Sequence, residues 1–239
     1  MSFGGVRFEW QRREPAVLQV LQNVIGLDMY HHHLVSAQLR DLRPTQVTVG
    51  YVEVEEKRRE WTELNKKQRR ELLESHVFPC VLGPKGRYYI VDHHHLGLAL
   101  LQEGTQRTQL TVLENFEYLA PDIFWRVMEF RRWTHPYDAS GRRVAYADLP
   151  KQLTELEDDP YRSLAGLVRR AGGFAKDTEP FSEFLWADFF RTQLSAKQVT
   201  DTRRKVLKIG LALAHSVEAR YLPGWSGEAK SIPPQQHHQ

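Results

Sequence analysis

The chain has 239 residues, of which 41% are hydrophobic and 26% are charged, and its formal net charge is +3 at pH 7. These values are typical of a globular protein with a substantial core, and the mild charge does not by itself indicate a nucleic-acid partner. The single cysteine, Cys80, excludes an intramolecular disulfide and favours a reducing compartment. No stretch approaches the roughly 20 apolar residues of a membrane span and no signal peptide is recognisable, so we expect a cytoplasmic protein without membrane association.

An N-terminal extension is predicted for residues 1–36. It contains "VLQVLQNVIGL", whose apolar spacing is compatible with a short amphipathic helix. The histidine tract His31–His33 follows, and we interpret it as part of a poorly ordered connector.

Residues 37–118 are predicted to form a small α+β domain with a mixed sheet. A β-rich segment ends near Gly50, and two helices follow over "EVEEKRREW" and "NKKQRRELLESH", the second capped by Asn65. The turn sequence "GPKG" separates two strand-like runs and predicts a hairpin. A helix ended by Gly104 and the strand "QLTVLENF" complete the domain.

A mainly helical region is predicted for residues 119–222, because the strand signals fade and Pro, Gly and Asp clusters separate the apolar patterns. Its predicted helices include "YADLPKQLTELE", "YRSLAGLVRRAG" and "FSEFLWADFFRTQL". Residues 223–239 are rich in proline and polar groups and are predicted to be a disordered tail.

The junction "YYIVDHHHLGLAL" places four titratable residues between a strand-like and a helix-like run. With Asp92 as N-cap, His93, His94 and His95 would occupy the first helical turn. A helix start presents unpaired amides and the positive end of the macrodipole, which together favour an anion and most commonly phosphate. Histidines there can donate hydrogen bonds to phosphate or act as a base near neutral pH.

The three histidines allow two other interpretations. Adjacent helical residues point about 100° apart, so the three imidazoles cannot bind one metal ion, and zinc is disfavoured. The remaining alternative is that one or two of them are buried and hydrogen-bonded, with no chemical role.

"LRPTQVTVGYVEVEEKRREW", the hairpin and "YYIVDHHHLGLALLQEG" together resemble the ParB/sulfiredoxin-like superfamily, and within it the ParB-like nuclease branch. The resemblance covers residues 42–115, and "GGFAKDTEPFSEFLWADFFR" is similar to the helical extension of the same branch. It implies a ParB/sulfiredoxin-like mixed sheet followed by helices. It also implies a phosphate motif at the strand–helix junction, where relatives hold ATP, ADP or CTP.

That motif usually reads like D-G-H-H-R. The resemblance implies that Asp92 takes the Asp position, His93 the Gly, His94 and His95 the two His, and Leu96 the Arg. The histidine in place of glycine leaves less room for the backbone to approach a phosphate closely. The leucine in place of arginine removes a bidentate phosphate donor, which could cost on the order of 1.5–3 kcal/mol of ligand binding. The missing charge could come from Lys57, Lys66 or Lys67.

The kinase branch of the superfamily uses a carboxylate near the end of the first strand as base. Glu53 and Glu55 lie in the corresponding region, and Lys57 lies one helical turn beyond Glu53. A carboxylate can take a hydroxyl proton while a lysine stabilises phosphate charge. The alternative is an ordinary i, i+4 surface pair.

A second acidic group lies in the helical region. Asp177, Glu183 and Asp188 could hold Mg²⁺ if they converge, because hard cations prefer carboxylate oxygens. The alternative is a capped amphipathic helix with acidic residues in its first turn.

We therefore expect an enzyme of phosphoryl or phosphodiester chemistry, either a nucleotide-dependent phosphotransferase or a nuclease or other hydrolase. Glu53, His94 and His95 are its candidate catalytic residues, and Asp92–His95 with Lys57 would bind the phosphorylated ligand. One alternative is a non-catalytic nucleic-acid-binding module of the partition type, in which the basic run Lys57–Arg70 faces phosphates. The other alternative is a scaffold that has kept the fold but lost the catalytic chemistry. The sequence leaves the oligomeric state open.

Overall fold

The computed structural model describes residues 34–201 and 203–228, so the predictions for His31–His33 and for residues 229–239 lie outside the described residues. A five-stranded sheet has the order β1-β6-β4-β5-β2. Its strands are β1 (Leu34–Gln38), β2 (Arg43–Pro44), β4 (Phe78–Gly83), β5 (Arg87–Ile90) and β6 (Arg107–Asn115). The β1–β6 and β4–β5 pairs are antiparallel, whereas β4–β6 and β2–β5 are parallel. The predicted mixed sheet is confirmed, and Leu34–Ser36, assigned to the extension, belong to it.

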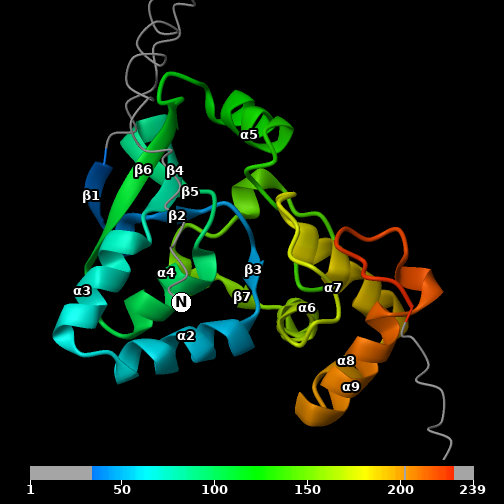
Figure 1. Cartoon of the computed structure of the whole chain (residues 1–239). Coiled ribbons are helices and arrows are strands. Elements are labelled where there is room, and N and C mark those ends of the chain that lie inside the picture. Colours follow the sequence, from blue (N-terminus) through cyan, green and yellow to red (C-terminus); the bar gives the residue numbers. More distant parts are fainter. Residues whose placement is uncertain (1–33, 202, 229–239) are drawn as a thin grey trace, which may run out of the picture. The chain divides into compact units, whose positions relative to one another are not determined.

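Three helices share a core with one face of this sheet (Figure 1). They are α2 (Tyr51–Glu63), α3 (Lys66–Ser75) and α4 (His94–Gln102). The side chain of Asn65 accepts hydrogen bonds from two amides of α3, as predicted for its N-cap. Residues on alternate sides of β5 separate the two faces: Ile90 packs with the α4 core, and Tyr89 packs with α5 (Pro121–Phe130).

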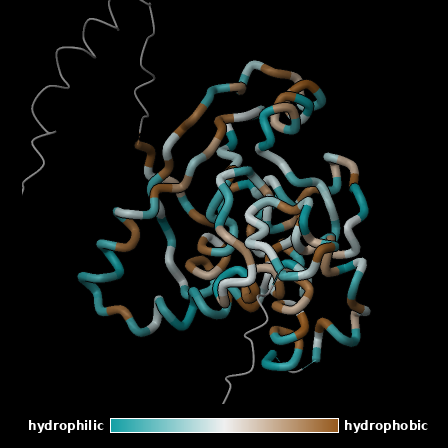
Figure 2. Tube along the Cα trace, turned by 45° about the vertical axis from the view of Figure 1, so that its right-hand side comes forward, coloured by the Kyte–Doolittle hydropathy of each residue, from teal (hydrophilic) through white to brown (hydrophobic). Residues whose placement is uncertain are grey.

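The C-terminal part is helical, as predicted. It comprises α6 (Pro160–Arg170), α7 (Ser182–Gln193), α8 (Ala196–Val199) and α9 (Arg203–Ala214), packed around Trp186 and Phe190. The trace alternates between hydrophobic and hydrophilic residues along its helices (Figure 2), as amphipathic helices with one buried face require. The predicted tail begins too early, because the carbonyl of Pro223 accepts a 2.9 Å hydrogen bond from the Trp186 indole.

The prediction of a helix over "YADLPKQLTELE" is wrong. The segment forms two short 3-10 turns, Tyr146–Asp148 and Leu153–Glu155, and is followed by β7 (Glu157–Asp158). Pro150 lies between the turns and cannot donate the amide that a continuous helix needs. β7 pairs in parallel with β3 (Thr48–Val49), so residues beyond the predicted boundary at 118 contribute to the first domain. No helix in the described part of the chain is long and apolar enough to span a membrane.

Candidate phosphate site at the start of α4

The helix after β5 begins one residue later than predicted. His93, not Asp92, is the N-cap of α4, and its backbone is left-handed, with φ 65° and ψ 22°. The Asp92 carboxylate accepts from the His93 amide at 2.6 Å and caps no amide within the helix. The prediction of Asp92 as N-cap is therefore wrong. The left-handed backbone also accounts for the glycine of the family motif at this position, because glycine adopts positive φ without strain.

The His94 side chain is enclosed, with 3% of its surface exposed. Its Nε2 atom accepts a hydrogen bond of 3.1 Å from the Thr45 amide. Burial lowers the pKa of His94 to about 3, although Asp92 opposes this shift. The imidazole is therefore neutral at physiological pH and joins the segment after β2 to α4.

His95 is also buried, with 9% of its surface exposed. Its Nε2 atom accepts a hydrogen bond of 3.0 Å from the Gly50 amide. Burial is the main cause that lowers the pKa of His95 well below its usual range, and the nearby Arg162 lowers it further. This geometry gives both imidazoles a positioning role. Catalysis by His94 or His95 stays a prediction. For Nε2 of either ring to exchange a proton with a substrate, it would first have to break its hydrogen bond to a backbone amide.

The first turn of α4 keeps its amides free of protein caps. Within the described ranges, no side chain caps this helix. The first amide of α4 that donates to a backbone carbonyl is that of Gly97, which lies 2.7 Å from the His93 carbonyl. The amides of His94, His95 and Leu96 precede it. This is the arrangement that favours an anion at a helix start.

Three helix starts meet around this turn, and only that of α4 lacks a side-chain cap. In α2, the Tyr51 amide donates to the Asp158 carboxylate at 2.8 Å, and the Val52 amide donates to the Ser163 hydroxyl at 3.3 Å. In α6, Asp159 accepts from two first-turn amides. The protein thus supplies anionic or polar partners to two positive helix ends and leaves the third open.

Glu53 and Lys57, predicted from the sequence, both lie beside the start of α4. A carboxylate oxygen of Glu53 lies 3.7 Å from Nε2 of His95, and the other lies 4.0 Å from Nζ of Lys57. Both side chains are partly exposed, at 17% for Glu53 and 31% for Lys57. Because α2 and α4 run side by side, a carboxylate, an ammonium and the free amides share one region.

Arg162 was missed by the sequence analysis. Its guanidinium lies 3.5 Å from Glu53 and also forms an ion pair with Glu183, although its side chain is only 9% exposed. A Cβ on Gly166, one turn along α6, would lie 3.3 Å from this guanidinium, so the glycine leaves room for it. The signal in the sequence was an arginine within the apolar pattern "YRSLAGLV", since arginine is rarely buried unless it is paired.

The three carboxylates proposed for Mg²⁺ are not brought together. Asp177 accepts from the Glu179 amide, Glu183 pairs with Arg162 and Arg169, and Asp188 pairs with Arg191. Across residues 34–201 and 203–228, no group of three potential metal ligands is present. The predicted metal site is therefore not formed: Glu183 and Asp188 pair with different arginines, and Asp177 accepts from a local backbone amide.

Leu96, at the position of the family arginine, is 7% exposed and packs in the core of the sheet domain. This position therefore supplies no cation to the start of α4. Residues 92–95 line neither of the two described pockets, which lie near the start of β6. The α4 start is therefore defined by its amides and by the groups of α2 and α6.

A mixed sheet with a strand–turn–helix junction of this kind defines the ParB/sulfiredoxin-like class of α+β proteins. Residues 31–192 match the model of the family described as "Putative ParB-like nuclease", and the chain belongs to this family. A crystal structure of protein Atu1540 from Agrobacterium tumefaciens is similar to it, with 45% sequence identity and a TM-score of 0.79. The similarity covers 84% of this chain and 100% of that protein. No curated protein matches the chain.

Proposed function

We propose that this chain binds a phosphate-bearing ligand at the start of α4 and acts on a phosphoryl or phosphodiester bond. The observation that carries the proposal is the uncapped first turn of α4 next to Glu53 and Lys57. Membership of a ParB-like family supports a link to nucleotides or nucleic acid. A cytoplasmic location stays a prediction.

In this proposal each group has a different role. The amides of the first turn and Lys57 bind phosphate oxygens, and Arg162 contributes positive charge from α6. Glu53 accepts the proton of the attacking hydroxyl or water, for which its partial exposure provides access. His94 and His95 stabilise the backbone around the ligand through their bonds to Thr45 and Gly50.

ATP, ADP and CTP are the candidate ligands, with Mg²⁺ as a companion of their phosphates. A nucleotide-bound ion would supply charge neutralisation, as it does in phosphoryl transfer generally. The separated carboxylates Asp177, Glu183 and Asp188 do not support an independent protein site for it.

Binding is tested by isothermal titration of the full chain with ATP, ADP and CTP, with and without Mg²⁺. We expect Lys57→Ala to weaken binding about tenfold or more, because a charge-assisted contact contributes about 1.5–3 kcal/mol. Lys151→Ala, which removes an exposed lysine from the loop before α6, is the control and should bind like the wild type. If none of the three nucleotides binds the wild type, the proposal fails.

The chemistry needs a separate assay. Single- and double-stranded DNA and a nitrophenyl phosphodiester should be followed for cleavage, and nucleotide hydrolysis should be measured in parallel. Glu53→Gln should retain ligand binding and lose turnover, since it keeps the shape of the side chain but not its basicity. Ligand binding without turnover in the wild type would instead favour the non-catalytic binding module.

A further inference from the structure

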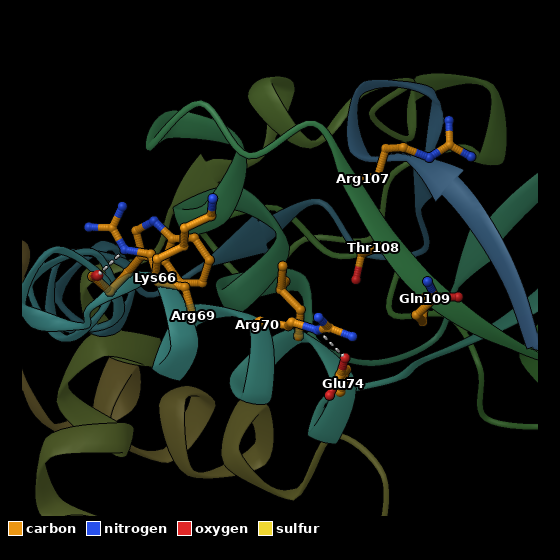
Figure 3. Close-up of a pocket in the computed structure, with 9 residues that line it drawn as sticks. Lys66, Arg69, Arg70, Glu74, Arg107, Thr108 and Gln109 are labelled. Atoms are coloured by element: carbon orange, nitrogen blue, oxygen red, sulfur yellow. Dashed lines mark hydrogen bonds and ion pairs between the residues drawn. The ribbon is translucent and has the colours of Figure 1, made fainter.

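A basic pocket lies between α3 and the start of β6, apart from the α4 turn (Figure 3). Its volume is about 380 Å³. The lining residues come from the end of α2, from α3 and from β6: Trp61, Lys66, Arg69, Arg70, Leu73, Glu74, Arg107, Thr108 and Gln109. Four of these are cationic and one is acidic, and none belongs to the phosphate site proposed above.

Most of the positive charge here is not neutralised by carboxylates. The guanidinium of Arg69 donates to the backbone carbonyls of Trp61 and Thr62, and that of Arg107 donates to Ser36. Such neutral partners orient a guanidinium but leave its charge uncompensated. The only carboxylate contact made by the four cations, among the described residues, is the 2.7 Å pair of Arg70 with Glu74.

Lys66 adds an exposed ammonium to the rim of the pocket. It has no acidic partner within the part of the chain that the structure describes, whereas its neighbour Lys67 pairs with Glu71 at 3.7 Å. Lys66 can therefore approach an incoming anion without first breaking an ion pair.

A second observation concerns Thr108. Its side chain lines the pocket and is 2% exposed, yet its hydroxyl has no hydrogen-bond partner in the described structure. Figure 3 shows this hydroxyl pointing from β6 toward α3. A buried hydroxyl without a partner is costly, and a polar ligand atom that reaches the floor of the pocket would satisfy it.

We propose that this pocket binds one nucleotide unit, either free or within a single strand of nucleic acid. Phosphate oxygens would contact Lys66 and Arg70, and the base would lie against Leu73 and the Arg69–Trp61 pair. The Arg69 guanidinium lies 5.1 Å from the centre of the Trp61 ring and offers a planar, cationic surface for stacking.

The size and lining of the pocket favour this ligand over a bare anion. Ligand pockets commonly have volumes of about 300–1,000 Å³ and combine apolar surface with a few polar groups. Inorganic phosphate would leave the apolar surface of Leu73 and Trp61 unused, and an acidic peptide offers no flat ring for the guanidinium. A duplex presents its backbone outside and keeps its bases stacked inside, so it cannot place a base in a pocket of this kind.

The test measures binding of fluorescent oligo-dT, of the matching duplex, of AMP and of polyglutamate to the full chain, over a range of salt concentrations. We expect oligo-dT to bind more tightly than the duplex or polyglutamate. Lys66→Ala combined with Arg70→Ala should weaken it at least tenfold and reduce the salt slope by about 1.4, since each phosphate contact in single strands contributes about 0.7. Tight binding of AMP, with no gain from the longer strand, would identify a free nucleotide as the ligand.

Two matched controls separate the pocket from general surface charge. Lys67→Ala removes a neighbouring lysine that does not line the pocket, and Thr111→Val changes a threonine further along β6. Both should bind like the wild type, whereas Thr108→Val should weaken nucleotide binding several-fold while the protein stays folded. The proposal is overturned if the Lys66 and Arg70 variant binds like the wild type, or if polyglutamate binds as tightly as oligo-dT. Because Lys57 lies outside this pocket, failure here leaves the test of the α4 site unaffected.

Discussion

Nε2 of His95 accepts a hydrogen bond from the backbone amide of Gly50 across 3.0 Å, and this bond joins the start of α4 to the start of α2. Gly50 in turn lies against α6, since a Cβ at this position would be 2.8 Å from the Ser163 amide nitrogen. Only a neutral imidazole nitrogen can accept such a bond. The junction of the three helices therefore depends on a histidine that stays uncharged.

Replacing His95 should destabilise the fold. His95→Ala leaves the Gly50 amide buried without a partner and creates a cavity, and we expect a loss of about 2–4 kcal/mol in the free energy of unfolding. Urea denaturation followed by circular dichroism measures this loss. His76→Ala, which removes an exposed histidine, should change the free energy by less than about 0.5 kcal/mol. Equal stability of the two variants would contradict the positioning role of His95.

Stability should fall as the pH drops below 6.5. The pKa of His94 is about 3 in the folded state and 6.5 for a free side chain, and the pKa values of His95 and His135 are also lowered by burial. Between these pH values the unfolded chain binds protons that the folded chain excludes. Each such histidine therefore removes about 1.4 kcal/mol of stability per pH unit, whereas above pH 6.5 its contribution is constant.

Unfolding free energies measured from pH 7.5 down to pH 5 test this dependence. His94→Gln keeps a side-chain oxygen that can accept from the Thr45 amide but cannot titrate in this range. Its stability should therefore change less steeply with pH than that of the wild type. Parallel curves would show that His94 does not carry the predicted linkage.

Arg162 should be among the most sensitive positions. Its removal leaves Glu53 and Glu183 without their shared guanidinium, so Arg162→Ala should cost about 3–5 kcal/mol of stability. Adding Glu183→Gln to this variant should recover part of the loss, because without Arg162 the partly buried Glu183 carboxylate keeps only Arg169 as a partner. Arg126→Ala, on the exposed side of α5, is the control and should be close to neutral.

Chemical denaturation of the single and double variants measures this coupling. A double variant less stable than Arg162→Ala alone would mean that Glu183 does not depend on Arg162 for its compensation.

The left-handed backbone of His93 gives a further prediction. His93→Gly relieves the positive φ, but it also removes an imidazole whose centre lies 5.2 Å from that of the Phe78 ring. We expect these effects nearly to cancel, to within about 1 kcal/mol. His93→Val loses the same contact and adds strain, because a β-branched residue is strongly disfavoured at positive φ. Thermal unfolding should therefore rank His93→Val below His93→Gly, and the reverse order would contradict the assigned backbone.

Local signals predicted much of the fold. Asn65 as a cap, the "GPKG" hairpin and the helix end at Gly104 all depend on contacts within a few residues, and the structure confirms them. The segment around Pro150 was predicted wrongly because its leucine spacing resembles that of an amphipathic helix. Leu153 and Leu156 are buried in the core beside α4, but they reach it from a 3-10 turn.

The candidate site was found in part. Glu53, Lys57 and the histidine run lie together as the sequence analysis expected, but the role of each histidine depends on a distant partner. His94 bonds to Thr45, 49 positions earlier, and His95 bonds to Gly50, 45 positions earlier. No local pattern contains such a pairing. Arg162 enters the site from a helix more than a hundred residues after Glu53, and it was missed for the same reason.

By itself the sequence determined the order and type of most elements, the family and the residues present at the β5–α4 junction. Only the tertiary structure decided that two imidazoles are buried as hydrogen-bond acceptors, that Glu183 and Asp188 pair with arginines and do not converge with Asp177, and that the basic run on α3 borders a pocket. Secondary structure follows from backbone bonds and apolar spacing within a few turns. Burial and charge pairing depend on which segments the folded chain brings together.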